Sequence, residues 1–161
     1  MNIRTLHVLV HPGFYSSWMR KHGEKDKIDP EILKMEADLI ETYRQKIGTL
    51  GNEDVLVILA PTQGAHFKTD VAEGESWVAL ARDAKTQLGK RCMSVSNPQI
   101  LENTSRRVSE KDSVDGMMKY LNARGFRITE ETACEVWGAA AEECVVQVAD
   151  AIFYQAPLRK R

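Results

Sequence analysis

The stretch Thr5-Leu-His-Val-Leu-Val-His-Pro-Gly-Phe-Tyr-Ser-Ser-Trp18 decides the fold. Its first part, Leu6 to Val10, is mostly apolar, rich in valine, and followed by His11, a proline and a glycine. Such a run is typical of a buried strand. Buried strands belong mainly to parallel sheets covered by helices on both faces, and in these sheets ligands bind at the carboxyl ends of the strands. We therefore expect a site near His11.

Strand-like and helix-like segments alternate along the rest of the chain. Asp29-Pro30-Glu31 has the residues of a helix start, and Val55–Ala60 is the clearest further buried strand. Thr129, followed by two glutamates, predicts a last helix that keeps one apolar face through Ile152. We expect strands over 5–10, 55–60, 92–96 and 126–128, and helices over 30–47, 77–88, 109–124 and 129–152.

This order predicts an α/β fold in which residues 1–161 form a single domain. The expected architecture is a three-layer α/β/α sandwich, Rossmann-like or flavodoxin-like, with a mostly parallel sheet of about four strands and right-handed crossovers. The order of the strands in the sheet does not follow from the sequence. A sheet this small has exposed edges, so we also expect a possible homodimer.

The composition is that of an ordinary globular protein, with 161 residues, 43% hydrophobic and 28% charged. A formal net charge of -1 gives no general attraction to nucleic acid or to an acidic membrane. The three cysteines have no disulfide or metal-ligand spacing, and neither a membrane helix nor a secretory signal is apparent. These features predict a soluble, cytoplasmic protein with no membrane or nucleic-acid partner.

Long connections follow the first three predicted strands. They span about 18, 13 and 13 residues, against two to six in most strand-to-helix connections. In a parallel sheet these connections leave from the same carboxyl edge, and long loops on a rigid sheet often carry binding and catalytic groups. We therefore expect a small-molecule site at this edge, with covering of the sheet end or a subunit contact as the alternative.

His11 is the best candidate for a catalytic acid or base, because imidazole titrates near neutral pH. The alternative is a structural histidine that bonds loop backbone. The adjacent residues Arg106 and Arg107 would suit a carboxylate or phosphate ligand, or they would be ordinary solvated surface. The expected ligand-binding residues in the three loops are Tyr15, Ser16, Thr62, Gln63, His66, Asn97, Arg106 and Arg107.

Several well-defined motifs are absent from the sequence. Neither the dinucleotide fingerprint nor the phosphate-binding P-loop follows a predicted strand, and no GxSxG elbow surrounds Ser16 or Ser17. The histidines form no metal-binding pattern with nearby acids, and His7 is expected to lie in the core or on a sheet face. The sequence therefore predicts no metal and identifies no cofactor.

The segment Gly138-Ala-Ala-Ala-Glu-Glu-Cys144-Val145 resembles the surroundings of the nucleophilic cysteine in isochorismatase-like and nicotinamidase-like cysteine hydrolases. The resemblance implies a strand ending at Gly138, a short turn, and Cys144 as a nucleophile at a helix start. That family also has a catalytic aspartate at the end of its first strand, where this chain has VLVHPGF without an acid. The helical spacing of residues 130–152 predicts instead a buried core thiol with a high pKa at Cys144.

Three functions follow from the sequence. The first is a binding protein or enzyme, such as a hydrolase or transferase, with an anionic or nucleotide-like small molecule at the carboxyl edge. The second is a cysteine hydrolase that uses Cys144. The third is a non-catalytic module that binds a protein partner through its loops.

Overall fold

A computed structural model describes residues 1–14, 29–60, 76–96, 110–138 and 144–155. It contains a four-stranded, all-parallel sheet in the order β3-β2-β1-β4. The strands are β1 (Thr5–Val10), β2 (Asp54–Ala60), β3 (Cys92–Ser96) and β4 (Ala133–Gly138). The order matches the first four positions of the Rossmann arrangement and differs from the flavodoxin-like one. The α/β class, the strand number and the parallel sheet are as the sequence predicts.

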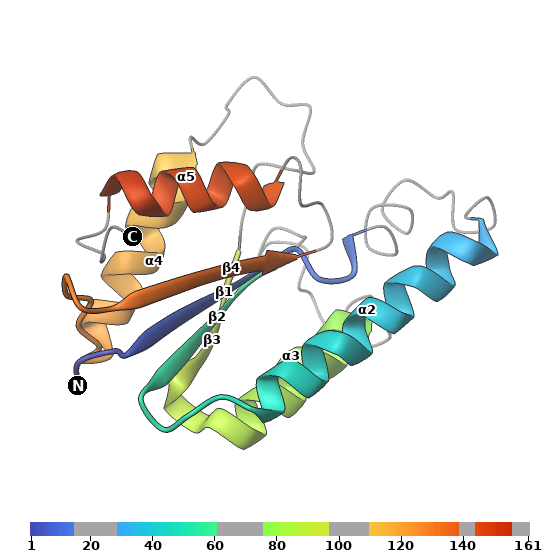
Figure 1. The fold of residues 1–161 in the computed structure, drawn as a ribbon, viewed down its shortest axis with the longest axis horizontal. Helices are drawn as coiled ribbons and strands as arrows, with labels where there is room; N and C mark the ends of the chain where they lie inside the picture. Colours follow the sequence, from blue (N-terminus) through green and yellow to red (C-terminus); the bar gives the residue numbers. More distant parts are fainter. Residues whose placement is uncertain (15–28, 61–75, 97–109, 139–143, 156–161) are drawn as a thin grey trace.

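Helices cover both faces of the sheet (Figure 1). One face, which we call the α2/α3 face, carries α2 (Pro30–Gly48) and α3 (Ser76–Leu88), and a short 3-10 turn, η3 (Gly89–Arg91), follows α3. The opposite α4/α5 face carries α4 (Glu110–Ala123) and α5 (Val146–Gln155). Among the described segments, no helix is long and apolar enough to cross a membrane.

Each face has its own hydrophobic core, because neighbouring side chains of a strand point to opposite faces. On β1, Leu6, Val8 and Val10 join the core under α4 and α5. Leu9 joins the core under α2 and α3. All four are buried, which explains why β1 reads as a nearly continuous apolar run rather than an alternating one.

The start of α2 follows the predicted chemistry. The Asp29 side chain accepts a hydrogen bond from the Glu31 backbone N–H at 2.9 Å, and Pro30 occupies the first turn. The helix ends at Gly48, one residue beyond the predicted range, with Thr49 as its cap. Gly89 and Gly125 have φ of 58° and 79°, and both turn the chain after a helix.

The last third of the chain differs from the prediction. Residues 129–152 do not form one helix, because Ala133–Gly138 is strand β4 and pairs with β1 along its whole length. The Thr129 hydroxyl accepts from the Glu131 N–H at 3.3 Å and the Thr129 carbonyl accepts from the Thr132 N–H at 3.0 Å, so the capping signal builds a single turn before β4.

The predicted strand at 126–128 is also wrong. Arg127 makes one isolated parallel bridge with Asn2, and Phe126 is a buried core residue. Thr132 fixes this region to the chain start, since its buried hydroxyl donates to the Ile3 carbonyl at 2.8 Å. The segment therefore leads into the sheet without becoming one of its strands.

Candidate functional site

The strand order places a change of direction beside β1. From β1 the chain adds β2 and then β3 on one side, and it returns to add β4 on the other side (Figure 1). In open α/β sheets, ligands bind in the crevice at the carboxyl ends of the two strands where the order reverses. Here those strands are β1 and β4, and their last residues, Val10 and Gly138, face each other in the register.

His11 is the first residue beyond β1 at this point. Its backbone N–H donates to the Leu59 carbonyl at 2.9 Å, so the contact with β2 extends to the turn. Its φ of 47° lies in the left-handed region, which costs a residue other than glycine roughly 1–3 kcal/mol. A strained backbone at a strand end is often associated with function.

The His11 side chain is buried, with 2% of the residue exposed. Within the described part of the chain, neither of its ring nitrogens has a hydrogen-bond partner. Burial lowers the pKa of His11 to about 4, so the imidazole is neutral at pH 7. In that state one ring nitrogen is a donor and the other an acceptor.

The turn after His11 packs closely against α3. Gly13 has φ of 72°, and a Cβ at this position would lie 3.2 Å from Trp77 Cβ. Trp77 is buried in the first turn of α3. The indole therefore lies beside the end of β1.

The start of α5 lies on the other side of the same edge. A Cβ on Gly138 would lie 2.5 Å from the Val10 carbonyl oxygen and 3.0 Å from Val145 Cγ2. Only glycine permits this approach. Cys144 and Val145 form a wider π-helical turn ahead of α5, and Cys144 is half-buried against the core of the α4/α5 face.

The other two cysteines are less suited to react as thiolates. Burial raises the pKa of Cys92 to about 11 and that of Cys134 to about 12. A thiol near a helix N-terminus is in an environment that favours the thiolate. By position, Cys144 is the cysteine with the better surroundings for a nucleophile.

His7 is buried on the α2/α3 face, as predicted. Its Nδ1 lies 3.6 Å from Glu135 Oε2 and its Nε2 lies 4.0 Å from Asp54 Oδ2. Burial lowers the pKa of His7, and the two carboxylates oppose this shift in part. Lys46 of α2 binds the Glu135 carboxylate at 2.9 Å and lies over the Trp137 ring.

Because β1, β2 and β3 are parallel, the segments that follow them leave from one edge of the sheet as predicted, and most of their residues lie outside the described part of the chain. Of the predicted site residues, His11 lies at that edge. The remainder fall outside the described residues, namely Tyr15, Ser16, Thr62, Gln63, His66, Asn97, Arg106 and Arg107.

The helical spacing of residues 129–152 concealed the contribution of β4 to this edge, whereas the resemblance around Cys144 implied a strand that ends at Gly138. The available signal was Gly138, which would weaken the interior of a helix but suits a strand end approached by other backbone. Comparisons with known proteins gave no match to a family model, to a curated protein or to a solved structure.

Proposed function

We propose that the protein binds a small anionic or nucleotide-like molecule in the crevice at the carboxyl ends of β1 and β4. The observation that carries this proposal is His11, a buried imidazole without a partner among the described residues, on a strained backbone, at the point where the strand order reverses. Buried polar groups are normally hydrogen-bonded, so an unpaired one beside an expected crevice suits a ligand contact.

In this proposal His11 serves as a neutral hydrogen-bonding group. With a pKa of about 4, the imidazole does not carry a proton at neutral pH. It would donate one hydrogen bond to an anionic oxygen of the ligand without requiring a protonation step. This role is related to the acid or base role expected from the sequence, but it needs no titration near pH 7.

The test is ligand-induced thermal stabilisation with inorganic phosphate, nucleotides and short carboxylates, each at millimolar concentration. A compound present at 100 times its Kd stabilises the folded state by about 2.7 kcal/mol, which raises Tm by several degrees. His11→Asn should abolish the shift, because asparagine tolerates the left-handed backbone but lacks the ring.

The matched control is His7→Gln, which removes a buried histidine inside β1, four residues before His11. The ligand-induced shift should survive in this variant, whatever its own stability. A shift that His11→Asn leaves unchanged, or no shift with any compound, would overturn the proposed site.

A second candidate function, a cysteine hydrolase, is favoured by the strand β4. The chain has a strand ending in glycine, a short connection and a cysteine at a helix start, which is the arrangement that the local sequence resemblance implies. The carboxyl end of β1 has His11 where that family has an aspartate, so the proton-accepting group would have to differ.

Alkylation of the native protein by iodoacetamide at pH 7, mapped by mass spectrometry, tests this second function. A nucleophilic Cys144 should react well before Cys134, whose buried thiol has a pKa of about 12 and serves as the internal control. A native Cys144 that stays unmodified, while the denatured chain reacts at all its cysteines, would exclude the hydrolase.

A further inference from the structure

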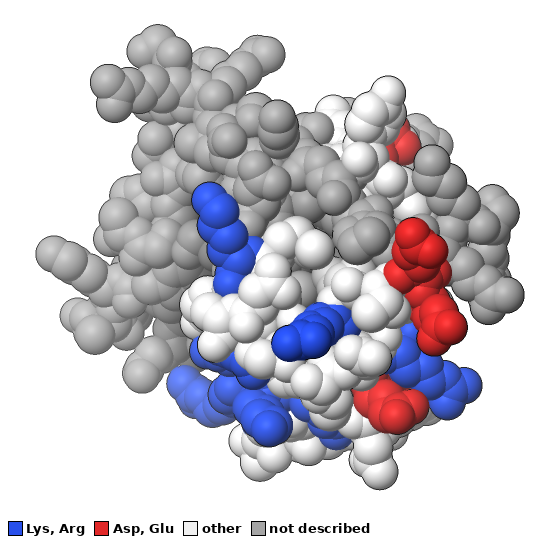
Figure 2. Space-filling view, turned by 90° about the vertical axis from the view of Figure 1, so that its left-hand side faces the viewer, with Lys and Arg blue, Asp and Glu red and all other residues white. Residues whose placement is uncertain are grey.

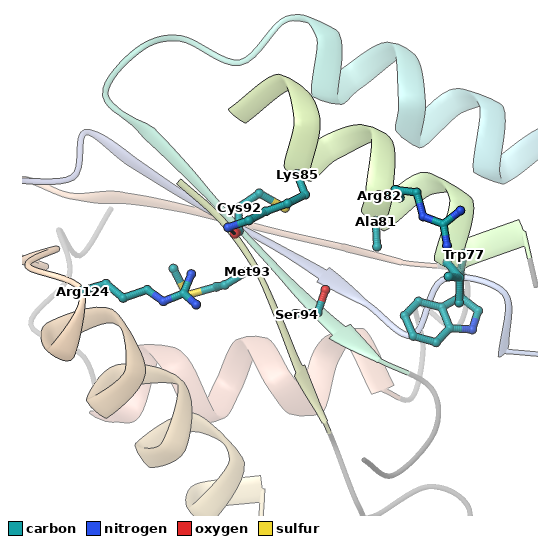
Figure 3. Close-up of a pocket in the computed structure, with 9 residues that line it drawn as sticks. Trp77, Ala81, Arg82, Lys85, Cys92, Met93, Ser94 and Arg124 are labelled. Carbon is teal, nitrogen blue, oxygen red and sulfur yellow. Dashed lines mark hydrogen bonds between the residues drawn. The ribbon is translucent and has the colours of Figure 1, made fainter. Parts of the chain in front are cut away.

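A cleft of about 370 Å³ lies along the outer edge of β3, between α3 and the end of α4 (Figure 3). Its volume falls within the range of small-molecule sites, about 300–1,000 Å³. Apolar atoms form most of its wall, with Val78 and Ala81 from α3 and Met93 from β3. The described lining of the cleft includes neither His11 nor any residue of β1 or β4, although Trp77 at one end also packs against the turn after β1.

The charged side chains that line the cleft are cationic. Arg82 and Lys85 come from α3, and Arg124 follows α4. In Figure 3, Arg82 and Trp77 lie at one end, Arg124 at the other, and Ser94 between them. The described lining includes no acidic residue, although the whole chain has a net charge of -1. This local excess of positive charge favours an anion.

Neighbouring contacts hold two of these cations in place without neutralising them. The Arg124 guanidinium donates to the Tyr120 hydroxyl at 2.9 Å and lies 4.5 Å above the Tyr120 ring. The Lys85 ammonium donates to the Cys92 carbonyl at 3.1 Å. Asp83, the acid next to Arg82 in sequence, pairs with Arg44 of α2 instead.

The amino edge of the sheet beside the cleft carries charges of both signs. The connections at this edge expose Arg4, Lys90, Arg124 and Arg127, together with Glu53, Glu130 and Glu131. Figure 2 views the molecule from this side, and Lys and Arg spread over the lower part of the described surface, with Asp and Glu towards its right. Of these groups only Arg124 is among the described residues that line the cleft, so an anion inside the cleft meets cations and no described acid.

The backbone of β3 argues against a peptide as the occupant. An added strand needs several unpaired N–H and C=O groups. However, the Cys92 N–H donates to the Gly89 carbonyl and the Cys92 carbonyl accepts from Lys85, so both groups are already used. Since peptide groups alternate in direction along a strand, the next residue whose groups face the cleft is Ser94, which is exposed.

We propose that this cleft binds a small anion with an apolar body, such as an aromatic carboxylate or an aromatic phosphate ester. The apolar body would lie against Ala81, Val78 and Met93, and the Ser94 hydroxyl and backbone would offer hydrogen bonds at the centre. The anionic group would bind Arg124 or Arg82, since a guanidinium matches carboxylate and phosphate oxygens in a bidentate manner.

Isothermal titration calorimetry with naphthalene-2-carboxylate, 2-naphthyl phosphate and the neutral 2-naphthamide tests the proposal. Both anions should bind, and the amide should bind at least about tenfold more weakly, because charge-assisted hydrogen bonds contribute more than neutral ones. Arg124→Gln and Arg82→Gln should each weaken binding of the favoured anion, with a loss of about tenfold for the more important one.

Arg127→Gln is the matched control, because it removes a nearby exposed arginine that does not line the cleft. It should leave the affinity within about twofold, whereas an equal loss would indicate general attraction and overturn the site. His11→Asn should also keep the affinity, which separates this cleft from the proposed carboxyl-edge site. No binding of either anion, or binding only of an acidic peptide, would likewise overturn the proposal. Circular dichroism checks that each variant is folded.

Discussion

At the scale of single residues, His11 combines features that rarely occur together. It is buried, has a left-handed backbone, and has neither ring nitrogen paired within the described residues. Each feature lowers stability, and the rest of the fold has to offset their sum. The proposed ligand contact would account for this cost, and the same burial makes the stability of the protein depend on pH.

The first prediction concerns this pH dependence. The folded pKa of His11, about 4, lies below the ordinary value of 6.5, so between these pH values the unfolded chain binds a proton that the folded chain does not. The contribution of His11 to stability is therefore present above pH 6.5 and is lost as the pH falls towards 4. From pH 7 to pH 5 the loss should be about 2 kcal/mol.

Urea unfolding of the wild type and of His11→Asn at both pH values measures this loss. The fall in the free energy of unfolding should be smaller in the variant by about 2 kcal/mol, since shifts at His7 and the carboxyl groups are common to both proteins. Equal falls in the two proteins would show that His11 is accessible to protons in the folded state.

At the scale of elements, β4 marks where sequence-based prediction succeeded and where it failed. The end of β1 and the start of α2 were predictable because local chemistry determines them. An apolar run before His-Pro-Gly indicates the strand end, and a capping Asp before Pro indicates the helix start. In β4 the residues Ala133, Val136 and Trp137 also fit helical spacing with the residues of α5. Its pairing with β1, a contact distant in sequence, decides between the two structures, and local periodicity does not contain it.

Gly138→Ala distinguishes these two structures by experiment. Inside a helix, alanine in place of glycine would stabilise the protein by up to about 1 kcal/mol. At the end of β4, the new Cβ would lie 2.5 Å from the Val10 carbonyl oxygen, so β1 and β4 must move apart. We expect a loss of about 1–3 kcal/mol in the free energy of unfolding, as for other overpacked sites.

Gly48→Ala is the control for this substitution. Gly48 is the last residue of α2, and a Cβ there would meet nothing within 4 Å. Denaturant unfolding should show a neutral or slightly stabilising effect in Gly48→Ala. If Gly138→Ala were equally harmless, the close approach of β4 to β1 would be refuted.

At the scale of the whole molecule, the strand order determines which residues share a site. The sequence predicts parallel strands whose carboxyl ends share one edge, and the structure confirms this. The sequence does not predict that β4 lies beside β1, because this neighbourhood depends on how segments distant in the chain pack together. The same applies to the cleft at β3, because Arg82 and Lys85 of α3 lie far in the sequence from Arg124, and the three line one cleft only through the packing of α3 and α4 beside the edge strand.

The sheet also divides the interior into two cores, and this division predicts how mutations combine. Ile152 of α5 is buried in the core of the α4/α5 face, and Ile47 of α2 is buried in the core of the α2/α3 face. Ile152→Val and Ile47→Val should each cost about 0.5–1.5 kcal/mol. Since the sheet separates the two sites, the double variant should lose the sum to within about 0.5 kcal/mol.

A pair of substitutions within one core shows how large the coupling energy is when two sites share a face of the sheet. Ile152→Val with Leu121→Val changes two residues of a single core, where the second cavity can relax into the first and the effects need not add. Urea unfolding of the single and double variants measures both coupling energies. A coupling across the sheet as large as that within one face would mean that the strands transmit packing changes. Ligand binding at the β1–β4 crevice would then affect helices on both faces, whereas independent cores would confine its effect to the edge where the strands end.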